Sequence, residues 1–531
     1  MNYTGHIDRF VRENLPPEDQ LPEFIFETPE LQFPEHLNAT ALLLDKALEE
    51  GAGERIAMIG KDIRWTYRDL QSKVNQLASL LTEDMGLIPG NRVLLRGGNT
   101  PWFAVCWLAV WKAGGVAVGT MPLLRAKELK QLIHLGRVSH ALCEASLAEE
   151  LNLARPECPE LKEVMVYGDD AFDKKLASKS AEFNAVDTAS DDPALIAFTS
   201  GTTGIPKGCI HLHRDVMAMC EVVCGYWLKP SADDVFIGTP PLAFTFGLGG
   251  LLCFPLWARA STVLMEKLSP PVLIGAIEQY GATITFTAPT GYRQMTPLIP
   301  QHNITSLKKS VSAGEALSVD TRKKWREATG IEMHDGIGGT ELIHIYLAAY
   351  PDDYREGSLG KPLPGYRAML VDEQMNPVPV GETGKLAVKG PTGCRYLADE
   401  RQKSSVRNGW TITGDAYHQD SDGYYYFHAR VDDIIVTSGY NVSSPEVESV
   451  LLEHPAVSEC GVIGIPDPDR GQVLKAFIVL KPGYTGDESM VKTLQDFVKQ
   501  NAAPYKYPRV VEFVTALPRT ETGKLQRFKL K

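Results

Sequence analysis

A glycine-rich stretch at residues 198–208, Phe-Thr-Ser-Gly-Thr-Thr-Gly-Ile-Pro-Lys-Gly, most constrains the fold of this chain. It follows an apolar run at residues 194–197, which predicts a short buried strand. Its glycines allow tight turns, and its hydroxyl groups and Lys207 suit a polyphosphate. An ordinary glycine-rich turn is the alternative from composition alone. The stretch is not a Walker A loop, because Pro206-Lys207-Gly208 stands where that pattern needs Gly-Lys-Ser/Thr.

Strand and helix patterns alternate through the first 400 residues and then change. Strand patterns at 56–59, 92–96 and 115–118 alternate with helical patterns at 41–50, from Thr66 onward and at 102–113. This alternation predicts parallel sheets covered by helices. After about residue 430, two helical patterns (445–453 and 488–501) flank strand patterns at 460–465 and 474–479. We therefore expect an α/β fold with a large, multi-subdomain N-terminal domain at 1–430 and a small, mobile α+β domain at 431–531.

Length, charge and cysteine content exclude several classes of protein. The 531 residues exceed one ordinary domain, and a net charge of −12 argues against nucleic-acid binding through phosphate neutralisation. The nine cysteines include no CxxC pair, which favours buried, reduced thiols in a cytoplasmic protein. The most apolar stretch, 247–265, is broken by Pro255 and Arg259, so it predicts buried protein and not a membrane span. The N-terminus has no signal-peptide pattern.

The glycine-rich stretch resembles the phosphate-binding signature of the adenylate-forming superfamily, which comprises acyl- and aryl-CoA ligases, peptide-synthetase adenylation domains and luciferases. The other signatures follow in order, at 240–247, 312–316, 335–341, 384–386, 409–415, 430–433, 438–441 and 518–524. Two positions depart from the usual pattern: Ala429 replaces a glycine, and Arg519 replaces a frequent lysine. The resemblance covers nearly the whole chain, which is thereby identified as a member of the superfamily.

The resemblance implies a role for each matching residue. The implied ATP- and AMP-binding residues are Thr199, Ser200, Gly201, Thr203, Gly204, Gly314, Glu315, Asp335, Gly336, Ile337, Gly338, Thr340, Asp415 and Arg430. The implied catalytic residues are Thr202, Lys207, Glu341 and Lys524. Glu341 would also be the Mg²⁺ ligand, because its carboxylate supplies hard oxygen. Asp415 would accept hydrogen bonds from both ribose hydroxyls. Outside these motifs, Glu341 and Lys524 would be solvated groups and Asp415 a turn residue.

The acid-binding residues implied by the resemblance point to an aromatic substrate. They are Phe244, Thr245, Phe246, Gly247, Ala313, Ile337, Gly338 and His344. The stretch 335–345 is similar to the aryl-CoA ligase branch, which includes benzoate- and 2-aminobenzoate-CoA ligases. Benzoate ligases tend to carry tyrosine where Phe246 stands, which favours 2-aminobenzoate and then benzoate. Core packing of the phenylalanines, and a His344 hydrogen-bonded within the core, are the alternatives from the residues alone.

The resemblance also implies coenzyme A as the thiol partner and a rotating small domain. The CoA-binding residues would be Gly439, Tyr440, Arg470, Tyr505 and Arg509, and Asp432 would be the hinge. The implied reaction uses ATP, Mg²⁺ and CoA: the acid attacks the α-phosphorus, pyrophosphate leaves, and the thiol then displaces AMP. The alternatives are an adenylation enzyme that loads a carrier-protein thiol, and a non-catalytic nucleotide-binding homologue. The sequence leaves a homodimer open.

Overall fold

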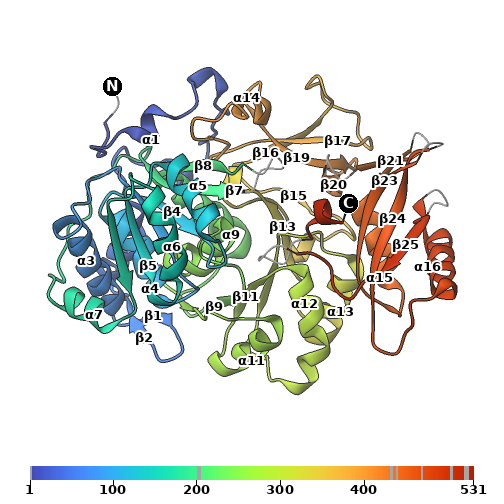
Figure 1. The fold of residues 1–531 in the computed structure, drawn as a ribbon, viewed down its shortest axis with the longest axis horizontal. Coiled ribbons are helices and arrows are strands. Elements are labelled where there is room, and N and C mark those ends of the chain that lie inside the picture. The colour runs from blue at the N-terminus through green and yellow to red at the C-terminus, as the bar shows by residue number, and fades with distance from the viewer. Residues whose placement is uncertain are drawn as a thin grey trace.

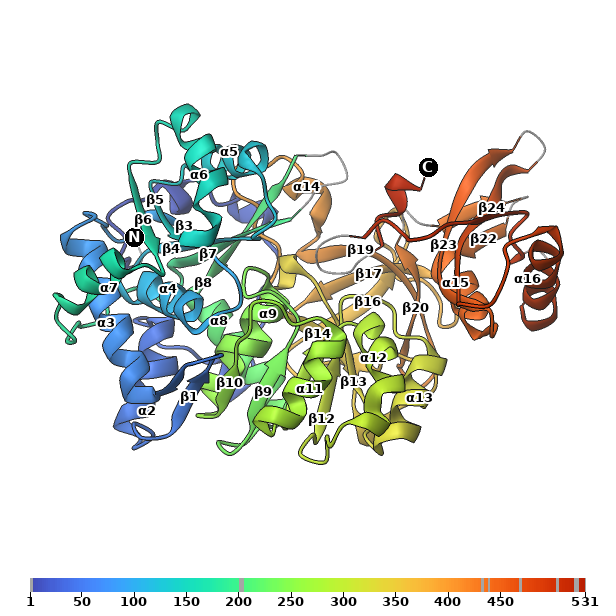
Figure 2. The same cartoon turned by 60° about the horizontal axis from the view of Figure 1, so that its bottom comes forward.

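The computed structural model describes residues 3–199, 205–430, 434–437, 440–467, 470–502, 506–519 and 525–530. These residues form a mixed α/β structure with four sheets. Figures 1 and 2 show three of the sheets in the first 430 residues and the fourth at one end of the molecule, with the C-terminal helices. The predicted fold class, a large N-terminal part with parallel sheets and a smaller α+β part, is confirmed. The boundary predicted at residue 430 stays a prediction.

A six-stranded sheet carries the glycine-rich stretch at one edge. Its strands in spatial order are β6 (Glu163–Tyr167), β5 (His140–Glu144), β3 (Arg92–Arg96), β4 (Val116–Thr120), β7 (Pro193–Thr199) and β8 (Lys207–Leu212). Neighbouring strands are parallel except for the β7–β8 pair. Strand β3 is buried along its whole length, as a strand covered on both faces requires.

A nine-stranded sheet lies beside the first sheet and carries the residues predicted to bind adenine. Its order is β15 (Lys361–Pro362), β14 (Ile345–Ala349), β13 (His334–Gly338), β12 (Lys309–Ser312), β11 (Ile284–Thr287), β9 (Val235–Gly238), β10 (Ser261–Val263), β1 (Ile56–Ile59) and β2 (Arg64–Thr66). The central strands are parallel, and antiparallel pairs close both ends. Parallel neighbours bring their carboxyl ends to one edge, where β12 and β13 present their motifs.

A third, antiparallel sheet leads to the C-terminal part. It consists of β16 (Arg367–Val371), β17 (Gly384–Lys389), β18 (Val406–Arg407), β19 (Trp410–Gln419) and β20 (Tyr425–Arg430). The fourth sheet follows with β21 (Ile434–Thr437), β22 (Tyr440–Ser443), β23 (Val457–Asp467), β24 (Gly471–Leu480) and β25 (Val510–Phe513). The predicted hinge residue Asp432 lies between β20 and β21, outside the described residues.

Helices cover the sheets, and the helical patterns predicted at 102–113, 445–453 and 488–501 correspond to helices of the structure. The α-helices are α1 (Phe10–Glu13), α2 (Lys46–Glu49), α3 (Tyr67–Glu83), α4 (Pro101–Lys112), α5 (Ala126–Gly136), α6 (Ala148–Ala154), α7 (Asp170–Ala177), α8 (His213–Cys220), α9 (Thr245–Leu248), α10 (Phe254–Trp257), α11 (Pro270–Tyr280), α12 (Pro289–Met295), α13 (Val319–Thr329), α14 (Gln402–Ser405), α15 (Ser444–Glu453) and α16 (Glu488–Asn501). Segments with π-helical hydrogen bonding occur at Ala41–Asp45, Glu221–Leu228 and Gly249–Cys253. The predicted threonine cap is confirmed: Thr66 begins α3 with a reciprocal capping box to Asp69.

The main apolar core lies between the two large sheets. Helix α4 contributes Trp107 and Trp111, which belong to one buried cluster with Phe236 of β9 and Phe286 of β11. A second cluster joins α5 and α6 to the six-stranded sheet, and a third joins α11, α12 and α13 to the nine-stranded sheet. The six-stranded and nine-stranded sheets are therefore both packed on their two faces. This packing fixes the strand ends from which the motif loops project. In the described part of the chain, no helix combines the length and apolar character that a membrane crossing needs.

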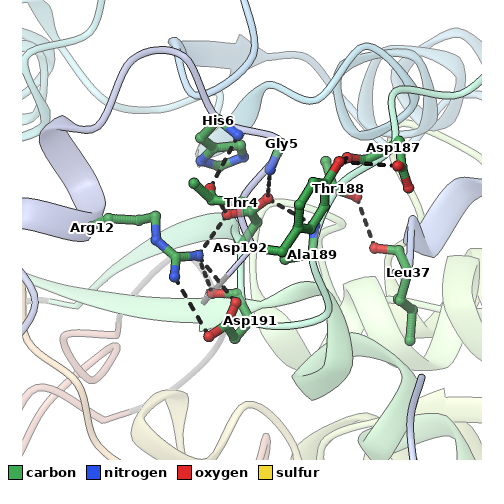
Figure 3. Close-up of polar contacts among 11 residues, drawn as sticks. Thr4, Gly5, His6, Arg12, Leu37, Asp187, Thr188, Ala189, Asp191 and Asp192 are labelled. Carbon is green, nitrogen blue, oxygen red and sulfur yellow. Dashed lines mark hydrogen bonds and ion pairs between the residues drawn. The ribbon is translucent and has the colours of Figure 1, made fainter. Parts of the chain in front are cut away.

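The N-terminal segment is fastened to the turn that precedes β7. Asp192, which is fully buried, accepts hydrogen bonds from the hydroxyl of Thr4 and from the backbone N–H groups of Gly5 and Ala189. The Arg12 guanidinium donates to the same carboxylate at 2.6 Å, and Figure 3 shows these donors converging on it. This arrangement satisfies a buried charge and fixes the start of the strand that leads to the glycine-rich stretch.

The C-terminal part has its own core. Helices α15 and α16 pack through Val447, Leu451, Leu494 and Val498 against the strands of the fourth sheet. Polar contacts among the described residues connect it to the rest of the molecule. Ser443 donates a hydrogen bond to the carbonyl of His428, and Arg519 approaches Glu315 at 3.4 Å.

Candidate active site

The glycine-rich stretch forms the connection between two paired strands. β7 ends at Thr199, which lies opposite Lys207, the first residue of β8. Gly208 packs tightly, since a Cβ atom there would lie 3.0 Å from Ile196. The predicted residues Ser200, Gly201, Thr202, Thr203 and Gly204 lie outside the described residues. The structure therefore places Thr199 and Lys207 side by side at the base of the stretch.

Lys207 is connected to Glu341 through a tyrosine that the sequence analysis did not select. The Lys207 ammonium donates to the Tyr396 hydroxyl at 3.1 Å, and that hydroxyl donates to Glu341 Oε1 at 2.7 Å. The ammonium also lies 4.8 Å from the centre of the Tyr396 ring. Burial, reinforced by the Glu341 carboxylate, raises the pKa of Tyr396, so the phenol stays protonated and acts as a donor.

A second series of polar contacts, made by buried side chains, fixes Thr340, the residue before Glu341. Arg395 donates to Asp215 at 2.6 Å, and Asp215 lies 3.7 Å from the His211 ring. Nε2 of His211 lies 2.7 Å from the carbonyl oxygen of Thr340. Burial alone would raise the pKa of Asp215, but the Arg395 charge and His211 outweigh it and lower the pKa to about 2. The predicted residue Thr340 is therefore held by its backbone.

The residues predicted to surround adenine lie at the ends of β12 and β13. Gly314 has a φ of 91°, a conformation that glycine adopts without strain, and Ala313 is buried beside it. The Glu315 side chain accepts hydrogen bonds from the backbone N–H of Thr290 (3.1 Å) and from its hydroxyl (2.7 Å). On β13, Gly336 lies close to Ile345, where a Cβ atom would be 2.7 Å from the isoleucine side chain.

One small cavity of about 30 Å³ brings several predicted residues together. It is lined by Gly338, Gly339, Glu341, Leu342, Tyr346, Thr411, Thr413 and Asp415. Strand pairing places Asp415 of β19 opposite Arg430 of β20. The predicted metal ligand Glu341, the predicted ribose ligand Asp415 and the glycine-rich end of β13 thus share one site. Thr411 and Thr413 belong to the 409–415 motif but were not selected from the sequence.

Phe246 and His344, which are predicted to bind the acid, join an aromatic cluster. Phe246 contacts Phe286 and His344 with ring centres 5.7 Å apart, and Phe254 lies 4.6 Å from His344. We call Phe246, Phe254, Phe286 and His344 the aromatic cluster. Phe244 precedes α9, which begins with the buried residue Thr245, and Gly247 leaves no room for a side chain, since a Cβ atom would lie 2.1 Å from the Pro241 carbonyl.

His344 is enclosed within the aromatic cluster. Its Nε2 lies 3.4 Å from the Phe246 carbonyl oxygen, and among the described residues its Nδ1 has no hydrogen-bond partner. Burial lowers the pKa of His344 to about 3, so the imidazole is neutral at physiological pH. Ile343, which precedes it, has a φ of 63°, unusual for a β-branched residue. The ring therefore offers one unused nitrogen beside apolar rings, which fits both interpretations of His344 drawn from the sequence.

Comparison with known proteins identifies the family. Residues 44–396 match the model of the AMP-binding enzyme family, and residues 446–524 match its C-terminal domain. The chain belongs to the AMP-binding enzyme family. It is 35% identical to the benzoate–CoA ligase of Thauera aromatica, over 95% of this chain and 97% of that protein. It is 34% identical to the mitochondrial acyl-coenzyme A synthetase ACSM5 of Homo sapiens, over 94% of this chain and 90% of that protein.

Solved structures of AMP-binding enzymes have the same fold as this protein. The anthranilate CoA ligase AuaEII, in complex with anthranoyl-AMP, has a TM-score of 0.89 at 33% identity and covers 95% of this chain and 98% of its own. A benzoate CoA ligase from Burkholderia xenovorans has a TM-score of 0.85 at 30% identity, over 93% of this chain and 99% of its own. The protein is therefore an acyl- or aryl-CoA ligase, an acid–thiol ligase that uses ATP and CoA. The predicted superfamily is confirmed.

The predicted cation site of this AMP-binding enzyme has a chemistry that fits Mg²⁺. Proteins commonly hold Mg²⁺ through one or two carboxylates together with phosphate oxygens and water. Glu341 supplies one carboxylate in the cavity, and the Tyr396 hydroxyl engages only its Oε1 atom. Glu341 would hold the ion against the phosphates of ATP, and Lys207 would contact the same phosphates.

The predicted CoA and hinge residues are described only in part. Arg470 lies in the exposed turn before β24, where its backbone N–H donates to Asp467. Arg509 precedes β25 and donates to the Tyr507 hydroxyl at 2.8 Å. Tyr440 begins β22 opposite Thr437. Gly439, Tyr505, Asp432 and Lys524, which is predicted to be catalytic, lie outside the described residues. All of these roles stay predictions.

The functional contacts that sequence reasoning missed join distant segments. Tyr396 is 55 positions from Glu341, and Arg395 is 180 positions from Asp215. No local pattern connects such pairs.

Proposed function

We propose that the protein is an aryl-CoA ligase that activates a small aromatic acid, with 2-aminobenzoate (anthranilate) preferred and benzoate second. The observation that carries this proposal is the aromatic cluster, which combines three phenylalanine rings with one neutral, buried imidazole. Apolar rings favour a flat benzene ring, and the unused nitrogen of His344 offers a polar contact to a substituent. The similarity to an anthranilate CoA ligase, solved in complex with anthranoyl-AMP, supports the choice.

The chain's own residues would perform the first half-reaction by positioning and by charge. Lys207 and the 199–204 segment would contact the phosphates of ATP, and Asp415 would accept hydrogen bonds from the ribose hydroxyls. The acid's carboxylate would attack the α-phosphorus, and pyrophosphate would leave with its electron pair, giving an acyl-adenylate. Lys524 would stabilise the charge that develops on the α-phosphate oxygens. When bound at Glu341, Mg²⁺ would neutralise phosphate charge.

The second half-reaction would use a different placement of the C-terminal part. Rotation about Asp432, with a domain boundary at 430/431, would withdraw Lys524 and bring Gly439 and Tyr440 beside the thiol-bearing arm of CoA. Arg470 and Arg509 would pair with the CoA phosphates. The thiolate sulfur would then attack the acyl carbon and AMP would leave. The Arg519–Glu315 contact supports a first-step arrangement in which the start of the 518–524 motif lies near the adenine segment.

The test is a substrate panel with three forms of the enzyme. We expect AMP and aryl-CoA to form fastest from 2-aminobenzoate, then from benzoate, and slowest from hydroxybenzoates and medium-chain fatty acids. His344→Phe keeps a ring in the cluster but removes its nitrogen, so it should reduce the preference for 2-aminobenzoate over benzoate about tenfold. Phe246→Tyr, which introduces the residue typical of benzoate ligases, should shift the preference toward benzoate.

Two outcomes would overturn different parts of the proposal. A preference of the wild-type enzyme for a fatty acid would refute the aryl assignment. A preference for benzoate, or a His344→Phe enzyme with unchanged selectivity, would refute only the choice of 2-aminobenzoate. Thioester formation with a carrier-protein arm but not with free CoA would favour the alternative thiol acceptor.

A further inference from the structure

Two oppositely charged side chains of the site are held apart by one hydroxyl group. Lys207 and Glu341 each contact the Tyr396 oxygen, at 3.1 and 2.7 Å, and they form no direct ion pair in the described structure. An ammonium and a carboxylate this close attract each other, and direct contact would strengthen that attraction. The phenol satisfies both groups without letting them meet.

Tyr396 is fixed firmly enough to act as such a spacer. Its side chain is 1% exposed, and its backbone N–H donates to the buried amide oxygen of Gln402 at 2.9 Å. It forms an isolated bridge with Cys209, two residues after Lys207. The preceding residue, Arg395, is anchored to the buried Asp215. The tyrosine cannot withdraw from between the two charges without breaking these contacts.

The other partner of the pair is fixed from the opposite side. His211 holds the carbonyl of Thr340, the residue before Glu341, and belongs to β8, the strand that begins at Lys207. The segment at 340–341 is therefore connected to the base of the phosphate-binding stretch by two independent routes, one through Tyr396 and one through His211. This double connection sets the distance between Lys207 and Glu341 before any ligand arrives.

We propose that Tyr396 is a positioning residue that keeps Lys207 and Glu341 from forming an ion pair, so that Lys207 stays available to phosphate and Glu341 to Mg²⁺. The inference rests on the proposed function, which assigns those two ligands. The hydroxyl occupies Glu341 Oε1 and leaves Oε2 for the cation, and it uses only one of the three N–H donors of Lys207. Loss of the hydroxyl would let the ammonium move onto the carboxylate and compete with the cation.

The experiment measures the Mg²⁺ dependence of ATP binding by calorimetry in the absence of the acid, so that no reaction occurs. In Tyr396→Phe, which keeps the ring beneath the Lys207 ammonium, we expect the Mg²⁺ concentration for half-maximal enhancement of ATP binding to rise about tenfold. Tyr67→Phe is the matched control, because it also removes a buried tyrosine hydroxyl. That hydroxyl donates to the carbonyl of Ala260, which lies between α10 and β10. That variant should bind ATP and Mg²⁺ as the wild type does.

The outcomes separate this inference from the proposed function. Wild-type protein whose ATP binding does not respond to Mg²⁺ would contradict the proposed function. A normal wild-type response, with Tyr396→Phe equal to Tyr67→Phe, would overturn the positioning role alone. If Tyr396→Phe does not fold, Tyr396→Met, which also lacks the hydroxyl, replaces it. A Mg²⁺ response of Tyr396→Met equal to that of the wild type would overturn the positioning role.

Discussion

At the scale of single residues, Asp335 shows how burial changes the pKa of a carboxyl group that its motif alone would suggest is ordinary. It lies on β13, fully buried, and among the described residues its Oδ1 has no hydrogen-bond partner. Burial raises the pKa of Asp335 to about 6, although Arg322 acts in the opposite direction. The folded state therefore holds a proton that the unfolded chain has already released between pH 4 and 6.

The consequence is a loss of stability as the pH rises. In this window the unfolded state binds fewer protons than the folded state, so the free energy of unfolding should fall by roughly 2 kcal/mol between pH 4 and pH 6. Asp335→Asn should abolish this component, which chemical denaturation at several pH values will measure. Asp234→Asn is the control. The pKa of Asp234 is lowered, so its contribution to the free energy of unfolding is lost mainly as the pH falls below about 4. This variant should keep the wild-type change in the free energy of unfolding between pH 4 and pH 6. An unaltered slope in Asp335→Asn would refute the argument.

At the scale of secondary-structure elements, the π-helical segment Gly249–Cys253 forms one wall of the aromatic cluster. A Cβ atom at Gly249 would lie 2.5 Å from His344 Cδ2 and 2.9 Å from the Phe254 ring. His344 is enclosed and cannot move aside easily. The glycine therefore sets the position of the imidazole through backbone contact alone, and the wider turn of the π-helix brings the backbone there.

We expect Gly249→Ala to raise the KM for the aromatic acid at least tenfold while leaving the KM for ATP unchanged, because the added methyl group displaces His344 and Phe254. Steady-state kinetics with each substrate varied separately will measure both constants. The matched control is Gly225→Ala in the π-helical segment Glu221–Leu228, where no atom lies within 4 Å of the added Cβ. Equal effects of the two variants would mean that helix strain, and not contact with the cluster, causes the change.

At the scale of the whole molecule, Arg519 joins the C-terminal part to the adenine segment. It donates to Glu459 of its own part at 2.7 Å and approaches Glu315 of the nine-stranded sheet's loops at 3.4 Å. Its neighbour in the motif, Lys524, is the predicted adenylation residue. An ion pair between two partly exposed side chains contributes about 1 kcal/mol or less, so it can favour one placement of the C-terminal part without locking it.

Arg519→Gln should therefore slow adenylation about threefold to tenfold and spare thioester formation from supplied acyl-adenylate. Lys524→Ala should show the same asymmetry in a much stronger form. The two half-reactions are measured separately, by pyrophosphate exchange and by CoA consumption. Arg527→Gln is the control, since Arg527 pairs with Glu448 inside the C-terminal part. Equal loss of both half-reactions in Arg519→Gln would contradict a role in one placement only.

The sequence by itself determined the elements and the order of the motifs. Periodicity predicted the strand β1, the helices α4, α15 and α16, and the capped start of α3, because these depend on neighbouring residues and on which face is buried. The motif order predicted the superfamily, and the comparisons confirmed it. Periodicity and motif order can be read from the sequence because they depend only on residues close together along the chain.

Only the tertiary structure decided how the motifs meet. The placement of Tyr396 between Lys207 and Glu341 depends on the pairing of a loop with β8, and the placement of Asp415 opposite Arg430 depends on the β19–β20 register. The neutral state of His344 and the raised pKa of Asp335 depend on enclosure by segments far away in the chain. Distances and pKa values of this kind come from sheet order and burial, which are properties of the packed molecule and leave no periodic trace in the sequence.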